Sequence, residues 1–172
     1  YPTYFHTYAQ MLSQMQAVHT AYPTLTSAVV SIGQTLEGRD IWAIEVSNAP
    51  GSHNATKAEV LMMGCHHARE PMSVEAPLDL LNYLTTQYGL KTEVTNIVNN
   101  QEVWIVPMVN PDGHVYCETT DQNWRKNRKN NGDGTFGVDN NRNYSYKWGL
   151  DNVGSSNQGG SDTYRGTGPN SE

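Results

Sequence analysis

The chain has few cysteines, few basic residues and no long apolar run. Only Cys65 and Cys117 are present among 172 residues, so a disulfide-dense scaffold is excluded. The two cysteines could form one disulfide or remain as two buried free thiols, and the sequence favours neither alternative. No segment has the length of apolar residues that a membrane-spanning helix needs, so we expect no membrane partner. Eleven Lys and Arg against seventeen Asp and Glu give a net charge of −6, which argues against binding nucleic acid.

The composition is that of a soluble globular domain. The chain is 37% apolar and 16% charged, and its length suffices for one core. Its 15 glycines and 10 tyrosines, with many Asn and Ser, indicate long ordered loops. The first residue is Tyr1, lysine is scarce, and sequons begin at Asn54 and Asn143, where they matter only in a eukaryotic secretory host. We expect a secreted protein.

The hydrophobic periodicity predicts an α/β protein. The spacing of apolar residues predicts a helix over 7–21, and two strands over 27–35 and 41–47 are expected to form a hairpin around 36–40. Residues 59–65 are almost continuously apolar, which predicts a central strand covered on both faces.

The second half of the pattern predicts further elements and then loses its periodicity. A helix is expected from Pro71 to Gly89, in which Pro77 marks either a kink or the true start. A short helix over 92–100 and a strand over 102–110 follow, whereas 111–172 has little periodicity. A patternless stretch of that length is unusual in a compact domain. We expect it to be functional or to depend on further chain for its packing.

Two adjacent histidines follow the apolar strand, and His67 lies three residues before Glu70. In a tight turn or a first helical turn, this spacing brings both side chains to one side. Imidazole and carboxylate are suitable zinc ligands, and with a second histidine they form an open catalytic site. The alternative is an exposed pair at a helix start, where the helix dipole favours Glu. The position after a buried strand favours a ligand site.

Five ordered motifs carry a family resemblance: "LEGRDIWAIEVS" (36–47), "GCHHARE" (64–70), "VNPDG" (109–113), "WRKNR" (124–128) and "GVDNNRNY" (137–144). Together they resemble the zinc metallocarboxypeptidases, and the sequence is most similar to the bacterial carboxypeptidase T type. The resemblance runs nearly end to end. It implies a mixed, mostly buried sheet with helices on both faces. Residues 1–172 would be the N-terminal portion of a single catalytic domain, apparently truncated.

The resemblance also implies roles for particular residues. His67 and Glu70 would bind one Zn²⁺, Asp139 would hold His67 through its other ring nitrogen, and His66 would be a packing residue. Arg125 would be catalytic, stabilising the oxyanion. The substrate-binding residues would be Arg69, Asn141 and Arg142, the last two holding a terminal carboxylate. A bidentate guanidinium suits that carboxylate. A solvated basic run and a plain polar loop are the competing interpretations of these motifs.

The implied activity is zinc-dependent removal of C-terminal amino acids, with peptide or protein C-termini as partners and a monomeric protein. In the family the third zinc ligand and the general base lie further along the chain, and none of His6, His19, His53 and His114 falls in an expected motif. The chain alone is therefore expected to be inactive. Alternatives are a zinc amidase acting on cell-wall peptides, and an incomplete fragment or peptide-binding module. Carboxypeptidase T relatives use structural Ca²⁺, but the sequence supports no calcium ligand here.

Overall fold

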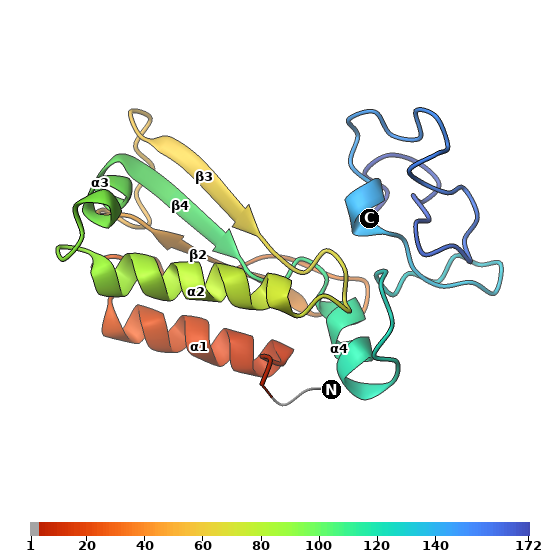
Figure 1. The fold of residues 1–172 in the computed structure, drawn as a ribbon, viewed down its shortest axis with the longest axis horizontal. Helices are drawn as coiled ribbons and strands as arrows, with labels where there is room; N and C mark the ends of the chain where they lie inside the picture. Colours follow the sequence, from red (N-terminus) through yellow and green to blue (C-terminus); the bar gives the residue numbers. More distant parts are fainter. Residues whose placement is uncertain (1–3) are drawn as a thin grey trace.

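A four-stranded mixed sheet organises the protein. The computed structural model describes residues 4–172. Its strands are β1 (Val30–Gln34), β2 (Asp40–Val46), β3 (Ala58–Met63) and β4 (Gln101–Val106). They lie in the order β1-β2-β4-β3, with β1–β2 and β2–β4 antiparallel and β3–β4 parallel (Figure 1). The predicted hairpin and the mixed α/β class are confirmed.

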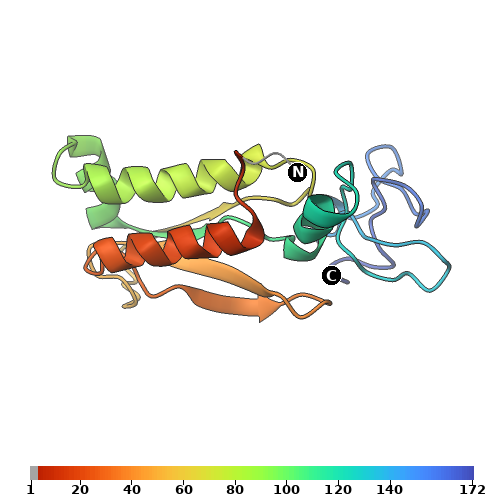
Figure 2. The same ribbon diagram turned by 90° about the horizontal axis from the view of Figure 1, so that it is seen from below.

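Two long helices, α1 (Tyr8–Ala21) and α2 (Met72–Gln87), lie side by side on one face of this sheet (Figures 1 and 2). Their apolar stripes meet the inward side chains of β2 and β4 in one core that includes Met11, Met15, Leu78, Ile44 and Ile105. The short α3 (Thr92–Asn100) adds two valines to the same core. The expectation of helices on both faces is thus met on one face by the described residues.

The prediction that residues 59–65 form a strand covered on both faces is wrong for the described chain. Here β3 pairs with β4 alone and is an edge strand of the sheet. Leu61 is 57% exposed, and Val60 and Met63 are also exposed. The apolar run correctly predicted a strand with two apolar faces. Nothing within residues 4–172 covers the face that carries Leu61.

The stretch expected to be patternless contains a helix, α4 (Pro111–Thr119), and a 3-10 turn, η1 (Asn140–Arg142). Asn110 caps α4 by accepting a hydrogen bond from the Gly113 amide, and Pro111 suits its first turn. The buried face of α4 includes Asp112 and His114. Because this face is polar, hydrophobic periodicity could not reveal the helix.

The β-hairpin turn and α4 are joined by a buried carboxylate. Asp112 accepts hydrogen bonds from the Thr35 hydroxyl (2.7 Å) and the Glu37 amide (3.1 Å), and it pairs with Arg39 (2.8 Å). The hairpin turn over 36–40 and the motif over 109–113 are therefore in direct contact. It fixes the hairpin against the edge of the sheet where β4 ends.

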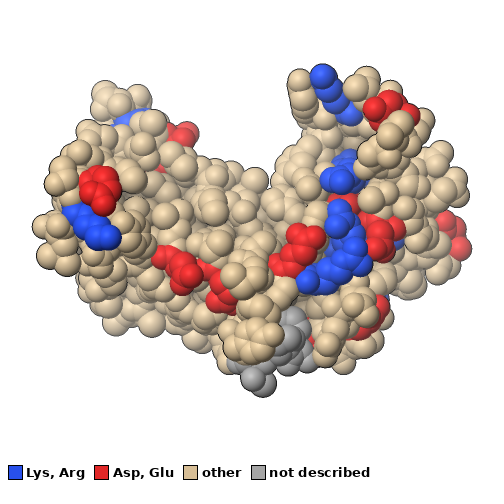
Figure 3. Space-filling view, in the orientation of Figure 1, with Lys and Arg blue, Asp and Glu red and all other residues tan. Residues whose placement is uncertain are grey.

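The loops after α4 are held by side chains rather than by a core. The amide of Asn143 donates to the carbonyls of Arg165 (2.8 Å) and Gly168 (3.0 Å) and is buried, so this sequon is closed in the folded chain. Figure 3 shows a notch between the sheet half and this loop half, with charged side chains gathered on the loop side. No helix described in the structure is long and apolar enough to cross a bilayer.

Both cysteines are buried free thiols, so the alternative of a disulfide is not realised. Burial raises the pKa of Cys117 to about 11 and raises the pKa of Cys65 still further. Both sulfurs are therefore protonated at neutral pH and act as small packing groups.

Candidate active site

The turn over residues 64–70 lies at the carboxyl ends of the two parallel strands. The Gly64 amide donates to the Val106 carbonyl, and the Val109 amide donates to the Gly64 carbonyl, each at 3.0 Å. The end of β3 is thereby joined to the end of β4. In open α/β sheets, the crevice beyond these strand ends is where ligands bind.

The turn packs tightly against the start of α2. A Cβ on Gly64 would lie 1.9 Å from the Ser73 carbonyl oxygen, so no larger residue fits. That carbonyl is open to this approach because Pro77, four residues later, has no amide hydrogen to donate to it. The Ser73 hydroxyl in turn accepts from the Cys65 amide at 3.1 Å. Gly64 and Pro77 together let the turn and the helix meet.

This turn directs His67 inward between two carboxylates. His67 Nδ1 lies 3.0 Å from Glu70 Oε1, and His67 Nε2 lies 3.1 Å from Asp139 Oδ1. His67 and Asp139 are buried, whereas the Glu70 side chain is 51% exposed. Asp139 also accepts from the Asn141 amide at 3.0 Å, which fixes its carboxylate at the start of η1.

Arg125 joins the two acidic residues. Its Nε and Nη2 both donate to Asp139 Oδ2, at 3.1 and 2.9 Å, and its Nη1 lies 3.6 Å from Glu70 Oε1. The Arg125 carbonyl also accepts from the Ala68 amide at 3.0 Å, so this segment is attached to the histidine turn. The result is a compact constellation of four side chains from 64–70, 124–128 and 137–144, the segments that the sequence motifs had marked.

The donor set fits a cation. When Nε2 of His67 donates its hydrogen to Asp139, Nδ1 carries a lone pair. That lone pair then faces a Glu70 oxygen, and two acceptors 3.0 Å apart need a proton or a metal ion between them. Neutral imidazole and carboxylate are zinc ligands, and a carboxylate on the second ring nitrogen is their usual support. Within residues 4–172, no third His, Cys, Asp or Glu side chain completes this pair.

The side chains expected to bind substrate lie outside the His67 constellation. Arg69 donates to the Asn123 carbonyl and pairs with Asp162, each at 3.0 Å, on the surface. Asn141 and Arg142 line a hollow of about 340 Å³ together with Lys147. The Arg142 guanidinium donates to the Gly154 and Asn141 carbonyls, at 2.7 and 2.9 Å, so backbone oxygens orient it. These residues stand apart from the His67 constellation, and their roles stay predictions.

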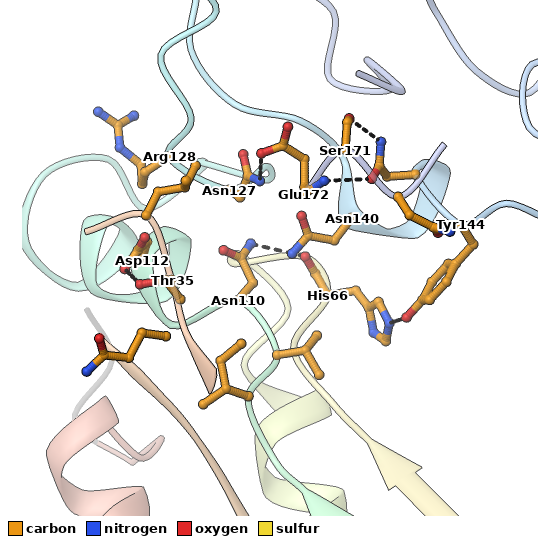
Figure 4. Close-up of a pocket in the computed structure, with 16 residues that line it drawn as sticks. Thr35, His66, Asn110, Asp112, Asn127, Arg128, Asn140, Tyr144, Ser171 and Glu172 are labelled. Carbon is orange, nitrogen blue, oxygen red and sulfur yellow. Dashed lines mark hydrogen bonds between the residues drawn. The ribbon is translucent and has the colours of Figure 1, made fainter. Parts of the chain in front are cut away.

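His66 points to a different place from His67. Its Nε2 lies 2.7 Å from the Tyr144 hydroxyl, at the edge of a cavity of about 470 Å³ beside the hairpin (Figure 4). Burial first, and then the neighbouring His67, lower the pKa of His66. The expected packing role of His66 stays a prediction, and the two adjacent histidines lie in different surroundings.

Sequence reasoning missed two residues that support the site. The Asn110 amide donates to the carbonyls of His66 (3.1 Å) and Lys126 (3.2 Å), so it links the histidine turn to the Arg125 segment. Lys126 is buried and donates to the Gly159 carbonyl at 2.6 Å. Asn110 has a sequence signal, the Asn-Pro pair at the end of the predicted strand over 102–110.

Comparisons with known proteins identify the family of the chain. A family model described as zinc carboxypeptidase matches residues 11–172. A zinc carboxypeptidase of Saccharothrix mutabilis subsp. capreolus is 36% identical over 150 residues, covering 86% of this chain and 34% of that protein. Metallocarboxypeptidase A of Trichophyton tonsurans is 36% identical over 166 residues, covering 96% of this chain and 38% of that protein.

Solved structures show the same fold. Carboxypeptidase A from Helicoverpa armigera superposes with a TM-score of 0.85 at 31% identity, covering 97% of this chain and 39% of that one. Thrombin-activatable fibrinolysis inhibitor gives 0.86 at 29% identity, covering 98% and 41%. The chain belongs to the zinc carboxypeptidase family. It spans somewhat more than a third of the length of these curated relatives. These relatives do not bear the carboxypeptidase T name, so that finer likeness stays a prediction.

Proposed function

We propose that the whole protein to which this chain belongs is a zinc-dependent exopeptidase that removes C-terminal amino acids from peptides. The observation that carries the proposal is His67, held by Asp139 on one ring nitrogen and facing Glu70 with the other. Family membership supports the zinc and the hydrolase chemistry. Because the chain spans only part of its relatives, the activity belongs to the proposal.

His67 and Glu70 would hold the zinc, which supplies a Lewis acid to polarise the scissile carbonyl and activate water. Asp139 keeps the His67 hydrogen on Nε2 and so leaves the Nδ1 lone pair for the metal. Arg125 contributes a fixed positive charge beside Glu70, where negative charge develops on the carbonyl oxygen during attack. Asp139 holds the Arg125 fork in place before substrate arrives.

Asn141 and Arg142 would bind the free carboxylate of the substrate. Arg142 lies on the rim of the hollow with its guanidinium oriented by two backbone carbonyls. A planar guanidinium can donate two parallel hydrogen bonds to a carboxylate, which an amidated end cannot accept in the same way. Arg69 would contact residues further from the terminus. Peptide and protein C-termini are the proposed substrates, and a secreted monomer is the proposed state.

The test compares substrates that differ only at the terminus. In the whole protein, Arg142→Ala should lower kcat/KM on a blocked peptide with a free C-terminus by about 10- to 100-fold, since it removes a hydrogen bond between charged groups. The much slower release from the amidated peptide should change little. Lys147→Ala is the matched control, because this substitution also removes a positive charge from the same hollow.

An equal loss of kcat/KM on both peptides would contradict the binding of the terminal carboxylate by Arg142. A wild-type enzyme that preferred the amidated peptide, or cleaved cell-wall peptides alone, would support the zinc amidase instead. Zinc binding without turnover of any peptide would indicate a peptide-binding module.

A further inference from the structure

A second group of potential metal ligands lies at the opposite end of the parallel strands from His67. Glu59 and Glu102 stand near the starts of β3 and β4 and are register partners in the parallel pair. His53, in the loop between β2 and β3, places its Nδ1 3.0 Å from Glu102 Oε2 and 3.4 Å from Glu59 Oε1. One ligand atom from each of these three side chains lies within 4.8 Å of the other two, and no other such group of His, Cys, Asp or Glu is found among residues 4–172.

A fourth carboxylate lies under the same loop with one oxygen unsatisfied. Glu45 on β2 is only 2% exposed, and it pairs in register with Trp104, two residues after Glu102 on β4. Side chains alternate along a strand, so Glu45 and Glu102 share one face of the sheet. Glu45 Oε2 accepts from the Gly51 amide at 2.7 Å, whereas its buried Oε1 has no partner. A buried carboxylate oxygen without a partner in the described chain is costly, and a cation beside it would offset that cost.

Glu102 is buried as well and holds the loop from the other side. It is 2% exposed, and its Oε1 accepts from the Asn54 amide at 2.6 Å. The loop over residues 51–54 is therefore fastened to the sheet by two desolvated carboxylates. Their charge must be compensated, because a buried charge without a counter-ion is strongly destabilising.

The charges of the described neighbours leave a deficit of positive charge. Glu45, Glu59 and Glu102 contribute three negative charges, and Lys57 contributes one positive charge. The Lys57 ammonium is bonded to the Ser47 hydroxyl (3.0 Å) and to Asn48 rather than to a carboxylate. With His53 neutral, the group carries a net charge of about −2 by this count, which a divalent cation balances.

We propose that His53, Glu59 and Glu102 form a structural site for a first-row divalent cation such as Zn²⁺, with Glu45 adding negative charge beside it. One imidazole nitrogen and two carboxylate oxygens suit Zn²⁺, Co²⁺ or Mn²⁺, whereas Ca²⁺ prefers six to eight oxygens. The cation would fasten the 48–57 loop to the starts of β3 and β4. The site is separate from His67 and Glu70, so it stands whether or not the proposed function holds.

The test is a Zn²⁺ titration by calorimetry of the whole protein carrying Glu70→Ala, which disables the other candidate zinc site. This background should bind one Zn²⁺. Adding His53→Ala or Glu59→Gln should weaken that binding at least tenfold and abolish the rise in melting temperature that Zn²⁺ produces. Both side chains are mostly exposed, at 64% and 63%, so the fold should survive, which circular dichroism checks. Glu93→Gln, an exposed carboxylate on α3, is the control for charge loss and should bind as the background does.

A background protein that binds no Zn²⁺ would overturn the proposal. Equal binding by the background and both variants would overturn it too. Tighter binding of Ca²⁺ than of Zn²⁺ would contradict His53 as a ligand, because it would mean a site made of oxygens alone.

Discussion

Two adjacent histidines with different surroundings define the site at the scale of single residues. His67 turns between Glu70 and Asp139, whereas His66 turns to Tyr144. The three-residue spacing predicted the contact of His67 with Glu70 from the sequence, and the family resemblance predicted its contact with Asp139. The bond of Arg125 to Asp139 could not be predicted, because it depends on how the 124–128 and 137–144 segments fold against each other.

Asp139 should act on the metal through His67. Asp139→Asn keeps the size of the side chain but removes the charge that holds the His67 hydrogen on Nε2. We expect zinc affinity of the whole protein to fall by about 10- to 100-fold, as for other carboxylates that support a ligand histidine. Competition with a chelator measures this affinity directly. Asp162→Asn, which removes the exposed partner of Arg69, is the control. Equal zinc affinity in Asp139→Asn and the wild type would rule out this supporting role.

At the scale of elements, the strand–turn–helix unit of β3, residues 64–70 and α2 positions the ligands. Periodicity predicted both elements, and it left open whether Pro77 kinks or starts the helix. In the structure Pro77 lies inside α2, one turn after its start. The tight approach of Gly64 to the Ser73 carbonyl could not be predicted, because it depends on the angle between strand and helix.

Gly64→Ala should destabilise this unit. The added Cβ would lie 1.9 Å from the Ser73 carbonyl oxygen and 2.7 Å from the Pro107 carbonyl oxygen. Both are backbone atoms, so strands or helix must move, at a cost of about 1–3 kcal/mol. Urea unfolding should show a lower midpoint, together with weaker zinc retention. Gly154→Ala, where nothing lies within 4 Å, should leave the midpoint nearly unchanged. Equal midpoints for the two variants would mean that the approach is looser than described.

At the scale of the whole molecule, one face of the sheet and the edge formed by β3 are left open in the described chain. The apolar run of β3 predicted burial that residues 4–172 do not provide, and this explains why the strand was predicted correctly but its surroundings were not. Side-chain hydrogen bonds such as those of Asn143 support the loops of 120–172. Such pairings leave no periodic signal, so this half could not be predicted from pattern.

Residues 1–172 expressed alone should associate and show no peptidase turnover. An unpaired edge with exposed apolar side chains favours contact between chains. Leu61→Lys, in the middle of the edge strand β3, should shift the protein toward monomer in sedimentation velocity experiments. Leu90→Lys is the matched control, since Leu90 is also exposed, at 76%, but lies in the turn after α2. A wild-type fragment that stays monomeric at all concentrations would contradict this account of the open face.

Zinc content tests the central claim, that the second of the two adjacent histidines is a metal ligand, most directly. The whole protein is purified as wild type, His66→Ala and His67→Ala, and zinc per chain is measured by mass spectrometry after dialysis. We predict that His66→Ala keeps the zinc content of the wild type and that His67→Ala contains one zinc fewer per chain. Undiminished zinc in His67→Ala, or the loss of one zinc in His66→Ala, would contradict the assignment.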